Sequence, residues 1–307
     1  MNEEGALTAS TGARLEEAFR LLANETRLEI LFALYDAPDR AVSFSALNER
    51  VGLGDSGRFN YHLKRLTDRF IYRTGEGYAL LFSGIAVCRS MLAAIDADGH
   101  GVEPFALDSA CYNCGESLEA RYDHEHVVVR CPHCGRGFHD FPLPPGALAG
   151  RTTEELLRVY DLWTRAQTVL AANGLCTWCF GRMSSAIVAE GPPGELTTGG
   201  ASGERENPVE RRVRVVHRCD RCTGDMRTTV GESVEAHSAV VAFLHEHGVD
   251  AFETPSWELE FMWNDALVTV LAEDPWEVRL TIPGEDETLS VTIDGDVRVL
   301  DVRREQV

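Results

Sequence analysis

The chain has 307 residues, of which 44% are hydrophobic and 25% are charged. This is an ordinary globular composition, and at roughly 150 residues per domain it predicts two or three domains. No stretch approaches the ~18 uncharged apolar residues of a membrane span. Composition therefore excludes a membrane protein, a collagen, a coiled coil and a wholly disordered chain. Residues 1–11 are acidic, and we expect them to be disordered. Because they lack a secretory signal, we expect a cytoplasmic protein.

The charge balance is unusual, with 49 acidic residues against 29 lysines and arginines, for a net charge of −20. Lys64 is the only lysine. A carboxylate-rich surface in which arginine replaces lysine resembles that of halophilic proteins, from organisms that accumulate molar salt; a generic acidic protein is the alternative. At ~1 M salt the Debye length is about 3 Å, so surface repulsion is screened. The acidic total therefore does not exclude a nucleic-acid partner.

Residues 12–98 have the periodicity of a small helical domain. Asn24 and Ser43 precede apolar repeats at helical spacing and are suited to cap helices. The elements expected, in chain order, are helices over Ala13–Leu22, Asn24–Tyr35, Phe44–Val51 and Ser56–Arg69, strands over Phe70–Arg73 and Tyr78–Phe82, and a helix over Ser83–Asp96.

The fourth of these helices is predicted to be amphipathic. Phe59, Leu63, Leu66 and Phe70 fall on one side, and polar and basic residues fall on the other. From Ser56 to Arg73 there are five bases and one acid, so this stretch is +4 within a chain of −20. A helix, a glycine-containing turn and a basic second helix are typical of a helix-turn-helix motif. DNA binding is expected, because a locally basic surface is enough to bind phosphates even when the whole protein is acidic. The alternative is a basic helix face that is simply solvated.

Residues 21–31 (LLANETRLEIL) and 59–66 (FNYHLKRL) resemble the winged helix-turn-helix regulators of the ArsR family. The resemblance covers about residues 12–96 and implies that residues 60–64 lie on a recognition helix in the major groove of double-stranded DNA. It makes Asn60, Tyr61 and His62 candidate base contacts. The full set of candidate DNA-binding residues is Ser56, Arg58, Asn60, Tyr61, His62, Lys64, Arg65, Arg69 and Arg73.

The same resemblance implies a homodimer that pairs through the first and fifth helices. It does not carry over the family's metal sensing, because Phe44–Val51 contains no cysteine and the fifth helix contains only Cys88. Cys88 is expected to be a small buried apolar residue, with a redox switch as the alternative.

The other eight cysteines form four Cys-x-x-Cys pairs, which in a reducing cytoplasm favour metal binding over disulfides. The predicted metal ligands are Cys111, Cys114, Cys131, Cys134, Cys176, Cys179, Cys219 and Cys222.

The first two pairs are separated by 16 residues with a β-prone segment between them. This spacing predicts a four-cysteine zinc ribbon over residues 105–145, with a redox dithiol or an iron centre as alternatives. His124, His133 and His139 are spare ligands in principle, but because four cysteines fill the coordination shell we expect each histidine to be exposed.

The last two pairs are 39 residues apart, which is long for a ribbon. Ser184–Ala189 and Val213–His217 are expected to pair as strands, and the Gly- and Pro-rich residues 191–208 predict a flexible loop. Loop closure entropy grows only logarithmically, so a second structural Zn²⁺ site is still expected. A thioredoxin-like redox role is disfavoured because no βαβ pattern surrounds these pairs.

Residues 150–307 are predicted to be a mixed helix and antiparallel-sheet domain, which makes the whole chain α+β. Thr152 and Glu155 form a capping box for a helix through Ala172, and a second helix is expected over Gly231–His247. Four β-branched runs predict an antiparallel meander within residues 266–303. Trp257, Trp263, Trp276 and Phe261 are interpreted as packing residues, with a pocket lining as the alternative.

The function expected is a sequence-specific, dimeric DNA-binding transcriptional regulator whose C-terminal region binds an effector or a protein partner. The order of C-terminal elements resembles the extensions of winged-helix regulators from salt-loving archaea. The alternative is a general transcription component that binds polymerase and promoter through the winged helix and the zinc ribbon. An enzyme is not expected, because no catalytic triad order, phosphate-binding glycine loop or open histidine-rich metal site is evident.

Overall fold

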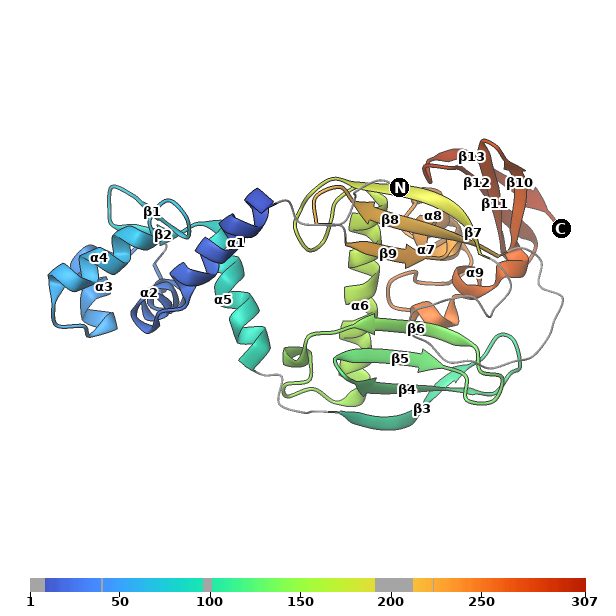
Figure 1. The fold of residues 1–307 in the computed structure, drawn as a ribbon. Coiled ribbons are helices and arrows are strands. Elements are labelled where there is room, and N and C mark those ends of the chain that lie inside the picture. The colour runs from blue at the N-terminus through green and yellow to red at the C-terminus, as the bar shows by residue number, and fades with distance from the viewer. Residues whose placement is uncertain (1–8, 40, 96–100, 191–211, 223) are drawn as a thin grey trace. The chain divides into compact units, whose positions relative to one another are not determined.

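In the computed structural model, the described residues are 9–39, 41–95, 101–190, 212–222 and 224–307 (Figure 1). They belong to two compact units, Met1–Asp98 and Gly99–Val307. Of the segment expected to be disordered, residues 1–11, the first eight lie outside the described residues; for residues 9–11 the expectation was wrong, because the first helix already begins at Ala9. The loop expected at 191–208 lies entirely outside them.

The N-terminal unit contains the seven elements expected from the sequence, in the expected order. They are α1 (Ala9–Leu22), α2 (Glu25–Tyr35), α3 (Phe44–Val51), α4 (Ser56–Leu66), β1 (Ile71–Arg73), β2 (Tyr78–Leu80) and α5 (Phe82–Ile95). Strands β1 and β2 form an antiparallel hairpin in which Ile71 lies opposite Leu80.

Side-chain caps fix where the helices of this unit begin. Asn24 accepts a hydrogen bond from the Arg27 amide at the start of α2, and Ser43 does the same for Ala46 at the start of α3. Asp55 caps α4 by accepting from the Gly57 amide at 2.8 Å. The first two caps were predicted from the sequence, whereas the Asp55 cap was not. Such caps each contribute roughly 1 kcal/mol.

The core of this unit is formed by the apolar faces of α2, α3 and α4. Leu31, Leu47 and Phe59 are completely buried, and Leu63 and Leu66 join them as predicted. Cys88 is also completely buried, and burial raises the pKa of its thiol to about 11. The expectation that Cys88 is a small packing residue is consistent with this position.

Helix α4 is shorter than the sequence predicted. The expected end at Arg69 was wrong, because the helix stops at Leu66 and Asp68 adopts a left-handed conformation with φ 66°. The Asp68 amide then donates to the Ile71 carbonyl at 2.7 Å, which turns the chain into the hairpin.

The C-terminal unit begins with a four-stranded antiparallel meander, as expected for a ribbon. Its strands, in spatial order, are β3 (Val102–Ala110), β4 (Ser117–Asp123), β5 (His126–Arg130) and β6 (Gly137–Pro142). The short helix η1 (Pro145–Ala147) leads to the long helix α6 (Thr153–Ala172), which begins with the predicted capping box of Thr152 and Glu155. One core joins the meander, α6 and the rest of the unit, so ribbon and C-terminal region form a single compact body.

A three-stranded antiparallel sheet follows, with the order β7 (Met183–Glu190), β8 (Arg212–Cys219) and β9 (Asp225–Thr228). The expected pairing of β7 with β8 is confirmed, with Ala189 opposite Val213. The single helix expected over Gly231–His247 was wrong. The chain forms α7 (Val230–Val234) and α8 (Ser238–Glu246), because His237 takes an extended conformation and its side chain caps α8.

The unit ends in the predicted antiparallel meander. Three short helices, η2 (Ser256–Glu258), α9 (Glu260–Trp263) and η3 (Asp265–Leu267), precede the strands β10 (Val268–Glu273), β11 (Trp276–Pro283), β12 (Glu287–Asp294) and β13 (Val299–Gln306). Val278, Leu280 and Val291 from the central strands are completely buried. Trp257 and Trp263 are also buried in this core, which confirms their interpretation as packing residues. No helix among the described residues is long and apolar enough to cross a membrane.

Candidate metal centres and nucleic-acid interface

The first four-cysteine cluster lies where two turns of the ribbon meet. One pair follows β3 and the other follows β5, so the antiparallel sheet brings both turns to the same end. The Sγ atoms of Cys111 and Cys134 are 3.7 Å apart, and those of Cys114 and Cys131 are 3.5 Å apart. Four sulfurs at ~2.3 Å from one tetrahedral ion would lie about 3.8 Å from each other. The cluster therefore has the dimensions of a metal site.

Backbone conformation explains why glycine follows the second cysteine of each ribbon pair. Gly115 and Gly135 have φ of 79° and 74°, in the left-handed region that side chains disfavour. The Gly115 amide donates to the Cys111 carbonyl at 2.8 Å, and the Gly135 amide donates to the Cys131 carbonyl at 3.0 Å. These tight turns hold the thiols in place.

The second cluster repeats this geometry at one end of the β7–β8–β9 sheet. The Sγ atoms of Cys176 and Cys222 are 3.7 Å apart, and those of Cys179 and Cys219 are 3.5 Å apart. Gly181 is required by close packing, since a Cβ there would lie 2.9 Å from the Arg221 Cβ and 3.2 Å from two of the thiols. The last two cysteine pairs therefore come together in one cluster although 39 residues separate them in the sequence.

Hydrogen bonds favour the metal-binding form of at least one thiol in this cluster. The backbone amides of Cys222 and Arg221 hydrogen-bond the Cys219 sulfur and lower the pKa of its thiol to about 6. The thiolate is the form that binds metal ions.

None of the nine cysteines, all of which are described, forms a disulfide, and the Sγ–Sγ distances in both clusters far exceed the ~2.05 Å of such a bond. In each cluster the four sulfurs lie within 4.8 Å of one another. The described residues therefore contain two four-cysteine groups that can each hold a metal ion.

The two clusters differ in what surrounds them. In the first, Tyr112 packs edge-on against Phe138 and donates its hydroxyl hydrogen to the Trp263 carbonyl at 2.7 Å. In the second, Trp178 is 66% exposed and Phe180 is 56% exposed. Phe180 moreover has φ 57°, at the position where the first cluster has glycine. A left-handed conformation costs a residue with a side chain about 1 kcal/mol, so a large aromatic is retained there against its backbone preference.

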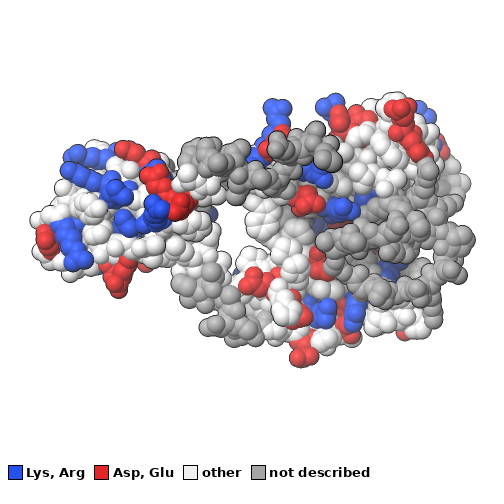
Figure 2. Space-filling view, in the orientation of Figure 1, with Lys and Arg blue, Asp and Glu red and all other residues white. Residues whose placement is uncertain are grey.

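The proposed recognition helix α4 exposes most of the side chains singled out from the sequence. Ser56, Arg58, Lys64 and Arg65 are exposed, Asn60 is half-buried, and Tyr61 is 58% exposed. Arg73 is exposed on the adjoining strand β1. Among the described residues, no acid forms an ion pair with Arg58, Lys64 or Arg65. Figure 2 shows blue side chains gathered on this unit.

His62 is not on the exposed side of α4, contrary to the expectation. It is only 8% exposed and its Nδ1 atom has no hydrogen-bond partner. Burial, reinforced by the charges of Arg27 and Arg58, lowers the pKa of His62. The cause is its place on the helix, one residue before Leu63 and three after Phe59, at the edge of the buried stripe.

Arg69, a predicted DNA-binding residue, is already paired within the unit. Its guanidinium forms an ion pair with Glu17 of α1 at 2.8 Å. The basic surface of α4 is therefore carried by Arg58, Lys64 and Arg65.

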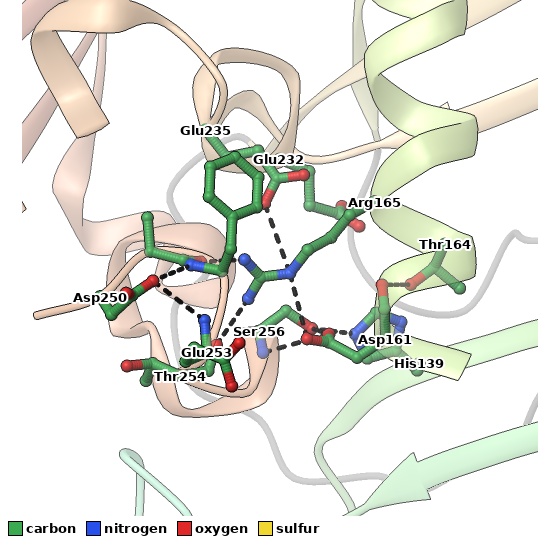
Figure 3. Close-up of polar contacts among 12 residues, drawn as sticks. His139, Asp161, Thr164, Arg165, Glu232, Glu235, Asp250, Glu253, Thr254 and Ser256 are labelled. Atoms are coloured by element: carbon green, nitrogen blue, oxygen red, sulfur yellow. Dashed lines mark hydrogen bonds and ion pairs between the residues drawn. The ribbon is translucent and has the colours of Figure 1, made fainter. Parts of the chain in front are cut away.

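A buried polar cluster that the sequence analysis missed lies between α6 and the segment around η2 (Figure 3). Arg165 Nε lies 3.1 Å from Asp161 Oδ2 and 3.9 Å from Glu235 Oε2, and all three side chains are buried. Arg165 also donates to the carbonyls of Ala251 and Thr254, the latter at 2.8 Å. The guanidinium is thus surrounded by the acidic side chains of Asp161 and Glu235 and by two backbone oxygens.

Asp161 continues the cluster through Ser256 to His139. The Ser256 hydroxyl donates to Asp161 Oδ1, so the His139 Nε2–H donates to the Ser256 oxygen at 2.7 Å. Burial and the nearby Arg165 charge lower the pKa of His139 to about 3. The expectation that His139 is exposed was wrong, because α6 and η2 cover this face of the ribbon; His124 and His133 are exposed as expected.

These three residues do not have the arrangement of a catalytic triad. Serine, not histidine, occupies the middle, and its hydroxyl is buried. A histidine with a pKa of about 3 is also a poor general base near neutral pH. The cluster is suited to hold α6, the ribbon and the segment around η2 together.

The fold and its clusters define a two-unit α+β protein with two four-cysteine metal-binding groups. A family model described as a domain of unknown function, DUF7351, matches residues 108–299, more than half of the chain, and the chain belongs to this family. A second model with the same description, DUF7347, matches residues 15–91. Comparison with curated proteins and with solved structures found no match in either case.

Proposed function

We propose that this protein is a dimeric DNA-binding transcriptional regulator whose N-terminal unit reads double-stranded DNA. The observation that carries the proposal is the exposed face of α4, where Arg58, Lys64 and Arg65 lie beside Tyr61 and Asn60 with no acid paired to the three cations among the described residues. Within a chain of net charge −20, such a face is suited to phosphates and base edges.

The surrounding elements support a winged helix-turn-helix. Helix α3 ends at Gly52, whose φ of 68° makes the turn, and Asp55 then caps α4. The β1–β2 hairpin follows directly and exposes Arg73, as a wing beside a recognition helix would. This arrangement supports the proposal of a winged helix-turn-helix over residues 12–96.

The dimer is supported by apolar side chains left exposed on α1 and α5. Phe19 is 70% exposed and Leu15 lies one turn before it on α1, while Phe82 and Leu92 are exposed on α5. Exposed large apolar residues in one small unit mark a protein-binding surface. A two-fold pairing of α1 and α5 would bury them and place two copies of α4 for two half-sites.

The metal in both clusters is proposed to be Zn²⁺ in a structural role. Four cysteine ligands in a closed tetrahedral set are typical of structural zinc. In the first cluster Tyr112 packs on Phe138, which in turn packs on Trp263, so the ion would brace the core of the C-terminal unit. This unit would receive the effector or protein partner that controls DNA binding.

The proposal is tested by selecting bound sequences from a random duplex library with the full chain at several salt concentrations. A regulator enriches one motif, typically with two half-sites, and binds it far more tightly than random DNA. The alternative, a general transcription component, predicts no enriched operator but retention of RNA polymerase. Absence of duplex binding at every salt concentration would refute both.

A further inference from the structure

The second four-cysteine cluster presents a surface that the proposed regulator function does not use. We propose that this surface binds single-stranded nucleic acid. It is called here the Trp178 surface, and it consists of Trp178, Phe180, Arg182, Arg218, Arg221 and Arg227, all of which are exposed.

The two aromatic rings of this surface are largely exposed to solvent. Trp178 and Phe180 both lie on the Cys176–Cys179 turn and are more than half exposed, whereas the aromatics beside the first cluster pack into the core. Phe180 keeps its ring outward from a left-handed backbone position that glycine occupies in the first cluster. Exposed aromatic rings on a rigid turn are platforms on which unpaired bases stack.

The two cysteine turns interlock, which makes this platform rigid. Trp178 reaches across to the other turn, where its Cδ1 would lie 3.9 Å from a Cβ placed at Gly224. In return, Arg221 extends from the second turn and donates to the Cys179 carbonyl at 3.2 Å. A ring and a guanidinium are thereby held at the same end of the sheet before any ligand binds, which lowers the entropic cost of binding.

Arginines extend the surface from the turns onto the sheet. In the strand register, Arg218 lies opposite Asp225 and Arg227 lies opposite Val216, so Arg218 and Arg227 share the exposed face. Arg182 follows the first turn directly.

Charge and shape together favour a nucleic acid. Within the described part of these turns and strands, the surface has four exposed arginines beside two exposed acids, Asp220 and Asp225, in a chain whose net charge is −20. Guanidinium groups that flank exposed rings match the alternation of phosphates and planar bases along an unpaired strand. A duplex does not offer this match, since its base faces are stacked on each other. An acidic polypeptide would use the arginines but not the flat rings.

The test uses the full chain and labelled single strands of about 20 nucleotides, one of RNA and one of DNA, in fluorescence anisotropy titrations. Wild type is expected to bind, and Trp178→Ala to weaken binding about tenfold or more, while Trp178→Phe retains most of it. The double variant Arg182→Ala/Arg218→Ala should flatten the dependence of log affinity on log salt by about 0.7 for each phosphate that is no longer neutralised. Each variant should keep the metal content of wild type, which shows that the cluster has formed.

This inference does not depend on the proposed regulator function, and the α4 variant separates the two. Arg58→Ala/Arg65→Ala should leave single-strand binding within twofold of wild type while duplex binding falls. Binding of either strand supports the proposal and identifies the sugar that is preferred. No binding of either strand, equal binding by Trp178→Ala, loss of binding in the α4 variant, or equally effective competition by polyglutamate would overturn it.

Discussion

Asp161 and Arg165 lie one turn apart on α6 and form an ion pair in which both side chains are buried. The pair is not isolated, because Arg165 also holds the carbonyls of Ala251 and Thr254, and Asp161 holds the Ser256 hydroxyl and amide. One helix turn thereby fixes the segment that leads into η2. Removing one member of such a network leaves buried charges without partners.

Arg165→Met should therefore destabilise the C-terminal unit by about 3–5 kcal/mol, as judged by denaturant unfolding. Arg165→Lys should lie between this variant and wild type, because it keeps the charge but not the planar fork that reaches both carbonyls. The matched control on the same helix is Arg158→Met. Arg158 forms an exposed ion pair with Glu253, so its removal should change stability by less than about 1 kcal/mol. Equal effects at the two positions would contradict the assigned role of the buried pair.

The same cluster predicts how stability depends on pH. Burial raises the pKa of Glu235 to about 8, and it outweighs the attraction of Arg165. Between the ordinary carboxyl pKa of 4.5 and about 8, the folded chain holds a proton that the unfolded chain has released. The contribution of Glu235 to the free energy of unfolding should therefore be fully present at about pH 4.5 and below. It should decline as the pH rises towards 8, by at most about 1.4 kcal/mol per pH unit.

Unfolding free energies measured at fixed salt between these limits test the assignment. Glu235→Gln should flatten the decline, because the amide carries no proton to release. Glu253→Gln, a change at an exposed carboxylate, is the control and should leave the profile of wild type. A profile that stays unaltered in Glu235→Gln would assign the pH dependence to other groups.

The metal clusters predict two Zn²⁺ ions per chain by elemental analysis of protein purified without chelator. Cys131→Ser and Cys219→Ser should each lower this to one, since each removes a ligand from a different cluster. Cys88→Ala should leave two, because Cys88 lies in the N-terminal core apart from both clusters. Loss of both ions in a single-cluster variant would show that the clusters do not form separately.

The proposed DNA contacts predict a charge-specific effect on binding. Arg58→Ala and Arg65→Ala should each weaken duplex binding and reduce the slope of log affinity against log salt by about 0.9 if the side chain contacts a phosphate. Arg303→Ala is a charge-matched control in the other unit, where Arg303 pairs with Asp301. If all three variants bind DNA alike, α4 is not the contact surface.

The proposed dimer predicts that a charge on the exposed face of α1 separates the protomers. Phe19→Glu should convert a dimer to a monomer in light scattering, because burying an unpaired carboxylate in an apolar interface is unfavourable. Leu162→Glu places the same charge at an exposed leucine of α6 and should leave the dimer intact. A wild-type monomer at all concentrations would contradict the pairing of α1 and α5.

Local patterns predicted most of the elements, because apolar spacing, caps and Cys-x-x-Cys pairs act over a few residues. Local patterns gave wrong predictions where the burial or the backbone conformation of a single residue determines the structure. His62 was placed on the exposed face of α4 because its position at the edge of the stripe is ambiguous on a helical wheel. Similarly, the break at His237 between α7 and α8 has no glycine or proline to signal it.

The buried cluster could not be predicted as a whole, because its members come from segments far apart in sequence. Asp161 and Ser256 are 95 residues apart, and His139 is brought to Ser256 only when η2 covers the ribbon. One signal was present, since Asp161 and Arg165 are opposite charges at i and i+4 on a helix with a broad apolar face. The exposure of Trp178 and Phe180 likewise became evident only from the structure.

The position of Lys64 has a practical consequence. As the only lysine in these 307 residues, it provides the one side-chain ε-amino group, and it lies exposed on α4. Among the side chains, acylating reagents, amine-directed cross-linkers and enzymes that acetylate lysine would find this one primary amine, in addition to the backbone α-amino group. Acylation there would remove a positive charge from the surface proposed to bind DNA, and protection of Lys64 from acylation would report occupancy of that surface.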